Sequence, residues 1–100
     1  MSASQQGTPR IRFQKPANQT DEQVAQRVSE IIYGTPDLNT NYNTGDAKWN
    51  LGGLNDWWMR VDASGQCTIT SRACNTGRME RVADTLRREA DPIHALVTTF

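Results

Sequence analysis

The sequence contains one histidine and two cysteines, too few for the common catalytic and metal-binding arrangements. Nucleophilic catalysis by a Ser-His or Cys-His pair needs a histidine as its base, and only His94 is available. Cys67, Cys74 and His94 lack the paired spacing of a zinc site. We therefore predict no catalytic residue, no metal ligand and no cofactor, in a protein that is not an enzyme.

Glycine-rich phosphate loops and calcium loops are missing as well. Leu51-Gly-Gly-Leu54 has no Lys-Ser/Thr pair after it, so it does not match a phosphate loop. Asp37, Asn39 and Asn41 alternate as calcium ligands do, but a calcium loop counted from Asp37 needs glycine sixth and glutamate twelfth. Those two positions hold Tyr42 and Lys48, which exclude such a loop.

Long apolar runs and an excess of either charge are also lacking. No apolar run approaches the ~18 residues that a membrane helix needs, and the N-terminus shows neither a basic leader nor an apolar stretch. We expect a cytoplasmic protein without a membrane contact. Lys plus Arg number 11 and Asp plus Glu number 11, so no global field attracts polyanions, although a local basic patch is still allowed.

The 100 residues fit one domain. Residues 1–9 are polar and end in Pro9, which predicts a disordered tail. Residues 10–100 then form a single α+β domain. Thr20 and Gln23 form the pattern of a capping box, and Gly34 is placed to end the helix that follows. The apolar stripe of this helix is Val24, Val28, Ile31 and Ile32.

Residues 10–15, 56–62 and 66–72 alternate between apolar and polar side chains, which is typical of half-buried strands. Gly65 favours a hairpin turn between the last two strands. A second amphipathic helix is expected from Arg78 to about Glu89, with Asn75 or Thr76 as its cap. Residues 93–100 are compatible with a strand or a helix, and their Val-Thr-Thr sequence favours the strand.

The expected order is therefore β-α-β-β-α-β. Such an order predicts an antiparallel sheet of three to four strands with both helices on one face, the ferredoxin-like arrangement. Residues 35–55 are rich in asparagine and glycine and are expected to form a long loop. Whether this loop covers the second face of the sheet, through Tyr42 or Trp49, is left open by the sequence.

The alternation also predicts the composition of the face opposite the helices. Cys67 belongs to the inner face, where its thiol would be buried and inert. Tryptophan and arginine, the types enriched at binding hot spots, gather on the opposite face, although ordinary solvated strand positions would look similar. That face comprises Arg10, Arg12, Gln14, Trp58, Arg60, Thr68, Thr70 and Arg72.

Two functions are compatible with such a surface. The first is a small protein-binding module, a regulator, inhibitor or accessory subunit of a larger complex; its small size would suit a protein encoded by a phage or mobile element. Its predicted partner-binding residues are Arg12, Tyr42, Trp49, Trp58, Arg60, Thr70 and Arg72. The second is a nucleic-acid binder that stacks bases on the tryptophan. Protein binding is favoured, because an RNA-binding sheet usually offers two or three aromatic residues on its central strands.

Overall fold

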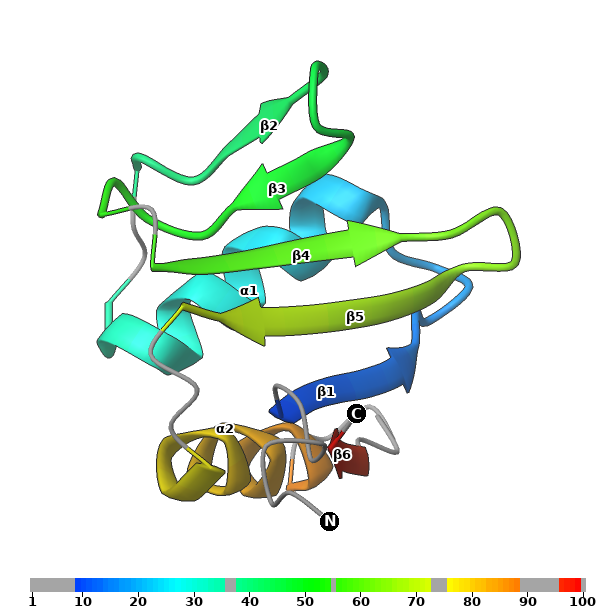
Figure 1. The fold of residues 1–100 in the computed structure, drawn as a ribbon. Coiled ribbons are helices and arrows are strands. Elements are labelled where there is room, and N and C mark those ends of the chain that lie inside the picture. The colour runs from blue at the N-terminus through cyan, green and yellow to red at the C-terminus, as the bar shows by residue number, and fades with distance from the viewer. Residues whose placement is uncertain (1–8, 36–37, 55, 73–75, 89–95, 100) are drawn as a thin grey trace, which may run out of the picture.

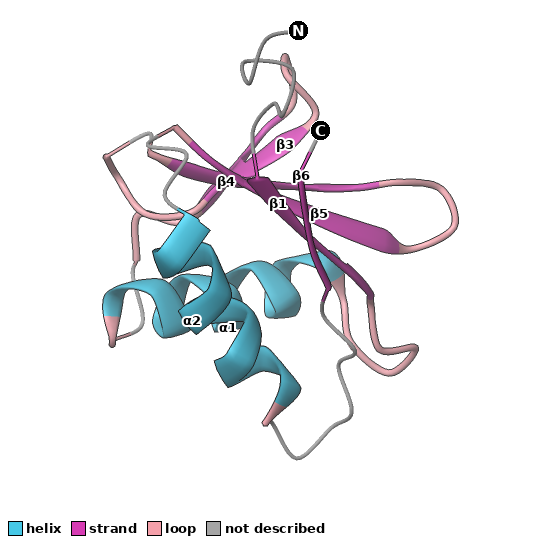
Figure 2. Ribbon diagram, turned by 60° about the horizontal axis from the view of Figure 1, so that its bottom comes forward, coloured by secondary structure: helices cyan, strands magenta, loops and turns pink. Residues whose placement is uncertain are grey.

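The structure, a computed structural model, describes residues 9–35, 38–54, 56–72, 76–88 and 96–99. Two helices lie on one face of an antiparallel sheet, which we call the covered face (Figures 1 and 2). The elements in chain order are β1 (Pro9–Gln14), α1 (Asp21–Tyr33), β2 (Asn41–Asn43), β3 (Lys48–Asn50), β4 (Trp57–Val61), β5 (Gln66–Ser71), α2 (Thr76–Arg87) and β6 (Leu96–Thr99).

The predicted α+β class, with both helices on one face of the sheet, is confirmed (Figure 2). The predicted count of three to four strands is wrong, because the described residues form a sheet of six strands in the order β2-β3-β4-β5-β1-β6. The four expected strands are neighbours within it, and the β2–β3 hairpin extends the sheet beyond β4 (Figure 1). The whole sheet is therefore not the four-stranded ferredoxin-like sheet that the sequence predicts.

Helix α1 begins and ends where its sequence predicts. The Thr20 hydroxyl accepts from the Gln23 backbone N–H at 3.1 Å, and the Gln23 side chain accepts from the Thr20 N–H at 2.8 Å. These two bonds satisfy donors that the first helical turn leaves free. At the other end, Gly34 takes the left-handed conformation with φ 82°, which a residue without a Cβ adopts at little cost.

The core lies between the covered face and the two helices. Alternate residues of the strands point into it, since successive side chains of a strand point to opposite faces. Helix α1 contributes its predicted apolar stripe, of which Ile31 is only partly buried. Helix α2 contributes the apolar side chains of its successive turns. The fully buried side chains include Ile11, Met59, Cys67, Ile69, Val24, Val28, Met79 and Leu86.

The central hairpin joins β4 to β5 as expected. Trp58 lies opposite Thr70 and Arg60 opposite Thr68 in its register. Gly65 closes the turn with φ 86°, and a Cβ at this position would lie 2.7 Å from the Gln14 side-chain nitrogen. The backbone conformation therefore requires glycine here, whereas the Gln14 amide is the end of a flexible side chain that can move away.

The first and the last strand of the described residues, β1 and β6, are neighbours in the sheet. Strand β6 pairs antiparallel with β1 from Pro9↔Thr99 to Arg12↔Leu96, which confirms the strand alternative for residues 96–99. Pro9, the last residue of the predicted tail, is instead the buried first residue of β1, and β6 pairs beside it. Residues 1–8, 93–95, 100 and the predicted cap at Asn75 lie outside the described residues.

Part of the expected loop at residues 35–55 is a four-residue turn between two short strands. The Asn43 side chain accepts from the backbone N–H of Gly45 at 2.9 Å and of Asp46 at 3.3 Å, which shapes the turn. The hairpin is tied to α1 through Thr40, whose hydroxyl donates to Ser29 at 2.8 Å and accepts from the Gly52 N–H at 3.2 Å. Within the described residues, no helix is long and apolar enough to cross a membrane.

Candidate functional site: the open face of the sheet

The side of the sheet away from the helices carries two parallel rows of polar side chains. Arg10, Thr70 and Trp58 are paired in register across β1, β5 and β4, and Arg12, Thr68 and Arg60 form the next row. These six side chains line a hollow of about 350 Å³. We call this surface, together with Lys48 at its border, the open face.

Lys48 is a part of this surface that sequence reasoning missed. Its ammonium group lies 4.9 Å from the centre of the Trp58 ring, a cation–π contact. It also forms an ion pair of 3.7 Å with the Asp46 carboxylate, and Arg60 donates to the Asp46 backbone carbonyl at 3.4 Å. The signal was present in the alternation of Lys48, Trp49 and Asn50, but three residues are too few to identify a strand.

Tyr42 and Trp49 do not join the other predicted binding residues. Trp49 is paired with Met59 and therefore faces the same side of the sheet, where it packs against the core. Tyr42 lies opposite Trp49 on the neighbouring strand, with ring centres 5.1 Å apart. The predicted set is thus divided between two faces, because Trp49 and Trp58 have opposite places in the alternation. In the described residues, neither aromatic ring of the hairpin covers the open face.

Arg72 lies just beyond β5, outside the residues that line the hollow. Its backbone N–H donates to the Asp56 carbonyl at 2.8 Å, which continues the β4–β5 pairing by one step. Of the seven predicted residues, Arg12, Trp58, Arg60 and Thr70 therefore lie together in the hollow. Arg10 and Thr68, which belong to the same predicted face, complete it.

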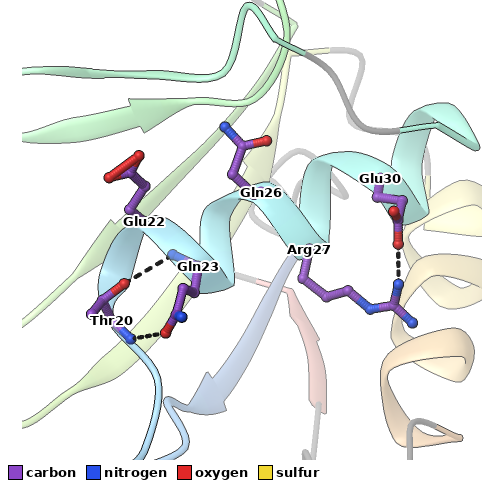
Figure 3. A pocket seen from close by; sticks show the side chains of 6 residues that line it. All are labelled: Thr20, Glu22, Gln23, Gln26, Arg27 and Glu30. Atoms are coloured by element: carbon purple, nitrogen blue, oxygen red, sulfur yellow. Dashed lines mark hydrogen bonds and ion pairs between the residues drawn. The ribbon is translucent and has the colours of Figure 1, made fainter.

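A second hollow, of about 570 Å³, lies along the outer side of α1. Four of its polar residues bind each other, as Figure 3 shows: Thr20 and Gln23 form the capping box, and Arg27 pairs with Glu30. Glu22 and Gln26 complete the lining with one further negative charge. Because these charges are mixed and largely paired, this hollow is a weaker candidate site than the open face.

Cys67, the one cysteine among the described residues, is buried and is not a reactive thiol. Burial, with a smaller contribution from the negative charge of Asp21, raises the pKa of the Cys67 thiol to about 12. A thiol with that pKa is almost entirely protonated at neutral pH and is a poor nucleophile. Among the described residues, no group of three or more His, Cys, Asp or Glu side chains could hold a metal ion. His94 and Cys74 lie outside those residues.

The structure also exposes two leucines that the sequence analysis did not single out. Leu38 is 93% exposed and Leu54 is 70% exposed, in segments that touch where Asn39 approaches Gly53. Isolated apolar residues on a surface are common, and their exposure alone does not define a site.

Comparisons with protein-family models, with curated proteins and with solved structures find no match for this chain.

Proposed function

We propose that this chain is a non-enzymatic protein-binding module, a regulator, inhibitor or accessory subunit that docks its partner on the open face. One observation carries the proposal: three arginines and a tryptophan converge on one hollow of a sheet whose other face is the core. Arginine and tryptophan dominate binding hot spots because each buries a large area and keeps directional donors. Strand register fixes the backbone positions from which these side chains project, so the backbone needs little ordering when a partner binds.

Nucleic-acid binding is the second candidate, favoured by the cations of the open face. A single strand on a sheet gains much of its affinity from bases stacked on aromatic rings. Among the described residues, Trp58 is the one aromatic residue that lines this hollow, and Lys48 lies over its ring. Since Trp57 and Trp49 face the core, the described part of the sheet offers no second ring for stacking on this side. Protein binding is therefore the better supported candidate.

The proposal is tested by capture of partners from a lysate of the native host, with and without nuclease. We compare the parent protein with a Trp58→Ala, Arg60→Ala double variant. Tyr42→Ala with Arg81→Ala is the matched control, because it removes the same kinds of side chain from other surfaces. A partner protein bound by the parent and the control in both halves, but lost with the open-face variant, is the expected result.

Two results would contradict the proposal. If the open-face variant retains every captured protein, the docking surface lies elsewhere. If nuclease removes all captured material, the nucleic-acid candidate replaces protein binding. Circular dichroism of each variant shows that lost binding does not reflect lost folding.

A further inference from the structure

The charges that line the hollow of the open face are all of one sign. Arg10, Arg12 and Arg60 line it, and among the described residues no acidic side chain does so. Two described carboxylates, in the turns that follow β2 and β4, have partners of their own. Asp46 pairs with Lys48, and Asp62 accepts hydrogen bonds from Ser64 and Gln66 within the β4–β5 turn. Although the whole chain has no net charge, this surface therefore presents a local positive field.

These cations are arginine guanidinium groups, which bind carboxylates in a fixed geometry. A guanidinium is planar and offers parallel N–H donors that match the two oxygens of a carboxylate. The Nε atoms of Arg10 and Arg12 are shielded from solvent, so the stems of these side chains lie against the protein. Side chains that are already held in place lose less conformational entropy when they bind.

The spacing of the arginines matches an extended chain. Arg10 and Arg12 are two residues apart on β1 and face the same side, about 7 Å from each other along the strand. Side chains at alternate positions of an extended peptide have the same separation, since each residue advances ~3.3 Å. Arg60 lies across β5 from Arg12, about 10 Å away by strand spacing, within reach of a third carboxylate.

We infer that the partner segment accepted by the open face is an extended acidic peptide with carboxylates at alternate positions, held by Arg10, Arg12 and Arg60. This inference rests on the proposed protein-binding function and names the chemistry of the partner. Trp58 and the methyl groups of Thr68 and Thr70 provide apolar area between the charges, so the intervening parts of the peptide also bury surface.

The inference is tested with the full-length protein and a synthetic peptide of alternating glutamate and threonine. Tryptophan fluorescence follows the titration, and a Trp58→Phe variant identifies the part of the signal that comes from Trp58. We expect saturable binding that weakens as salt increases, because the pairs are partly solvated. Arg12→Gln is expected to weaken binding about tenfold or more, since it removes a charged partner at the centre of the site.

Three controls make the test specific. A peptide of alternating glutamine and threonine removes only the charge, and one with its glutamates in consecutive blocks changes only the spacing. Arg27→Gln removes a cation from the outer side of α1 and is expected to leave peptide binding unchanged. We expect the blocked peptide to bind several-fold more weakly than the alternating one.

Several outcomes would overturn the inference: no binding, equal binding of the glutamine peptide, or tighter binding of a single-stranded oligothymidine than of the acidic peptide. Its failure is distinguishable from that of the proposed function. If the acidic peptide does not bind but the open-face variant still loses a protein partner from the lysate, protein binding stands and only the acidic chemistry is wrong.

Discussion

Trp57 and Trp58 are neighbours in the sequence, yet they belong to different parts of the molecule. Trp57 is 4% exposed and faces the core, with the Arg78 guanidinium 5.7 Å from its ring centre. Trp58 is half-buried on the open face, beneath Lys48. Each tryptophan thus has a cation over its ring, but Arg78 connects a helix to the core whereas Lys48 borders a hollow.

The comparison extends along all three central strands. On the covered face, Ile11, Met59 and Ile69 contribute to the core, while Arg12, Arg60 and Thr70, each the next residue in the chain, line the hollow. A single set of backbone hydrogen bonds therefore supports both the stability of the domain and the geometry of its candidate site. Substitutions on one face should change one property and largely spare the other.

The largest difference is expected between Met59→Asp and Arg60→Gln. Met59 is 0% exposed, so a carboxylate there would be buried without a partner, at a cost comparable to the ~5–15 kcal/mol that stabilise a small domain. Arg60 is exposed, and its replacement should change stability by less than about 0.5 kcal/mol. Thermal unfolding followed by circular dichroism measures both. A cooperative transition of Met59→Asp near that of the parent would contradict the core described above.

An intermediate difference is expected between Trp57→Ala and Trp58→Ala. Removing the buried ring of Trp57 should cost about 3–5 kcal/mol, because it leaves a cavity between the sheet and the helices. Removing Trp58 should cost about 1 kcal/mol or less, since its ring is half-buried and its cation–π contact is solvated. Urea unfolding gives both values. Equal losses would mean that the open face is a second core and not a docking surface.

The smallest effect concerns Asp62, at the turn between β4, which carries both of these tryptophans, and β5. Hydrogen bonds from the Ser64 side chain and from the backbone N–H groups of Gln66 and Ser64 hold the pKa of Asp62 below its usual value. A carboxyl with a depressed pKa stabilises the fold above its unfolded pKa, and this contribution is lost as the pH falls through the folded pKa. Asp62→Asn should therefore lower the Tm slightly at neutral pH.

The pH dependence separates this charge effect from a change in turn geometry. The difference in Tm between Asp62→Asn and the parent should shrink as the pH falls through the lowered pKa of Asp62, because the carboxyl of the parent then becomes protonated. Glu80→Gln, an exposed position on α2, is the matched control and should show no such dependence. A difference in Tm that stays constant over the whole pH range would show that the charge of Asp62 contributes nothing.

Local sequence patterns were sufficient to predict the helices and the longer strands. The capping box at Thr20 and Gln23, the left-handed Gly34 and the hairpin turn at Gly65 all depend on residues within a few positions of each other. The six side chains that line the hollow also followed from the sequence, since an alternation over five or six residues determines which side chains share a face.

The β2–β3 hairpin could not be predicted in the same way. Its strands have three residues each, with asparagine at three of the six positions, and neither length nor propensity favours a strand. The hairpin is stabilised from outside, by pairing with β4, by burial of Leu51 and by the contact of Thr40 with Ser29 on α1. These contacts join residues that are distant in sequence, or residues whose local sequence pattern is too weak to predict the contact.

The sequence by itself therefore determined the two helices, the central strands and the side of each strand that carries arginine and tryptophan, because these depend on local periodicity. Only the tertiary structure decided that Lys48 borders the same hollow, that Tyr42 and Trp49 lie on the opposite side, and that six strands form the sheet. The physical reason is that strand pairing is non-local: a short strand has no preference of its own until a neighbouring strand supplies hydrogen bonds and a surface to cover.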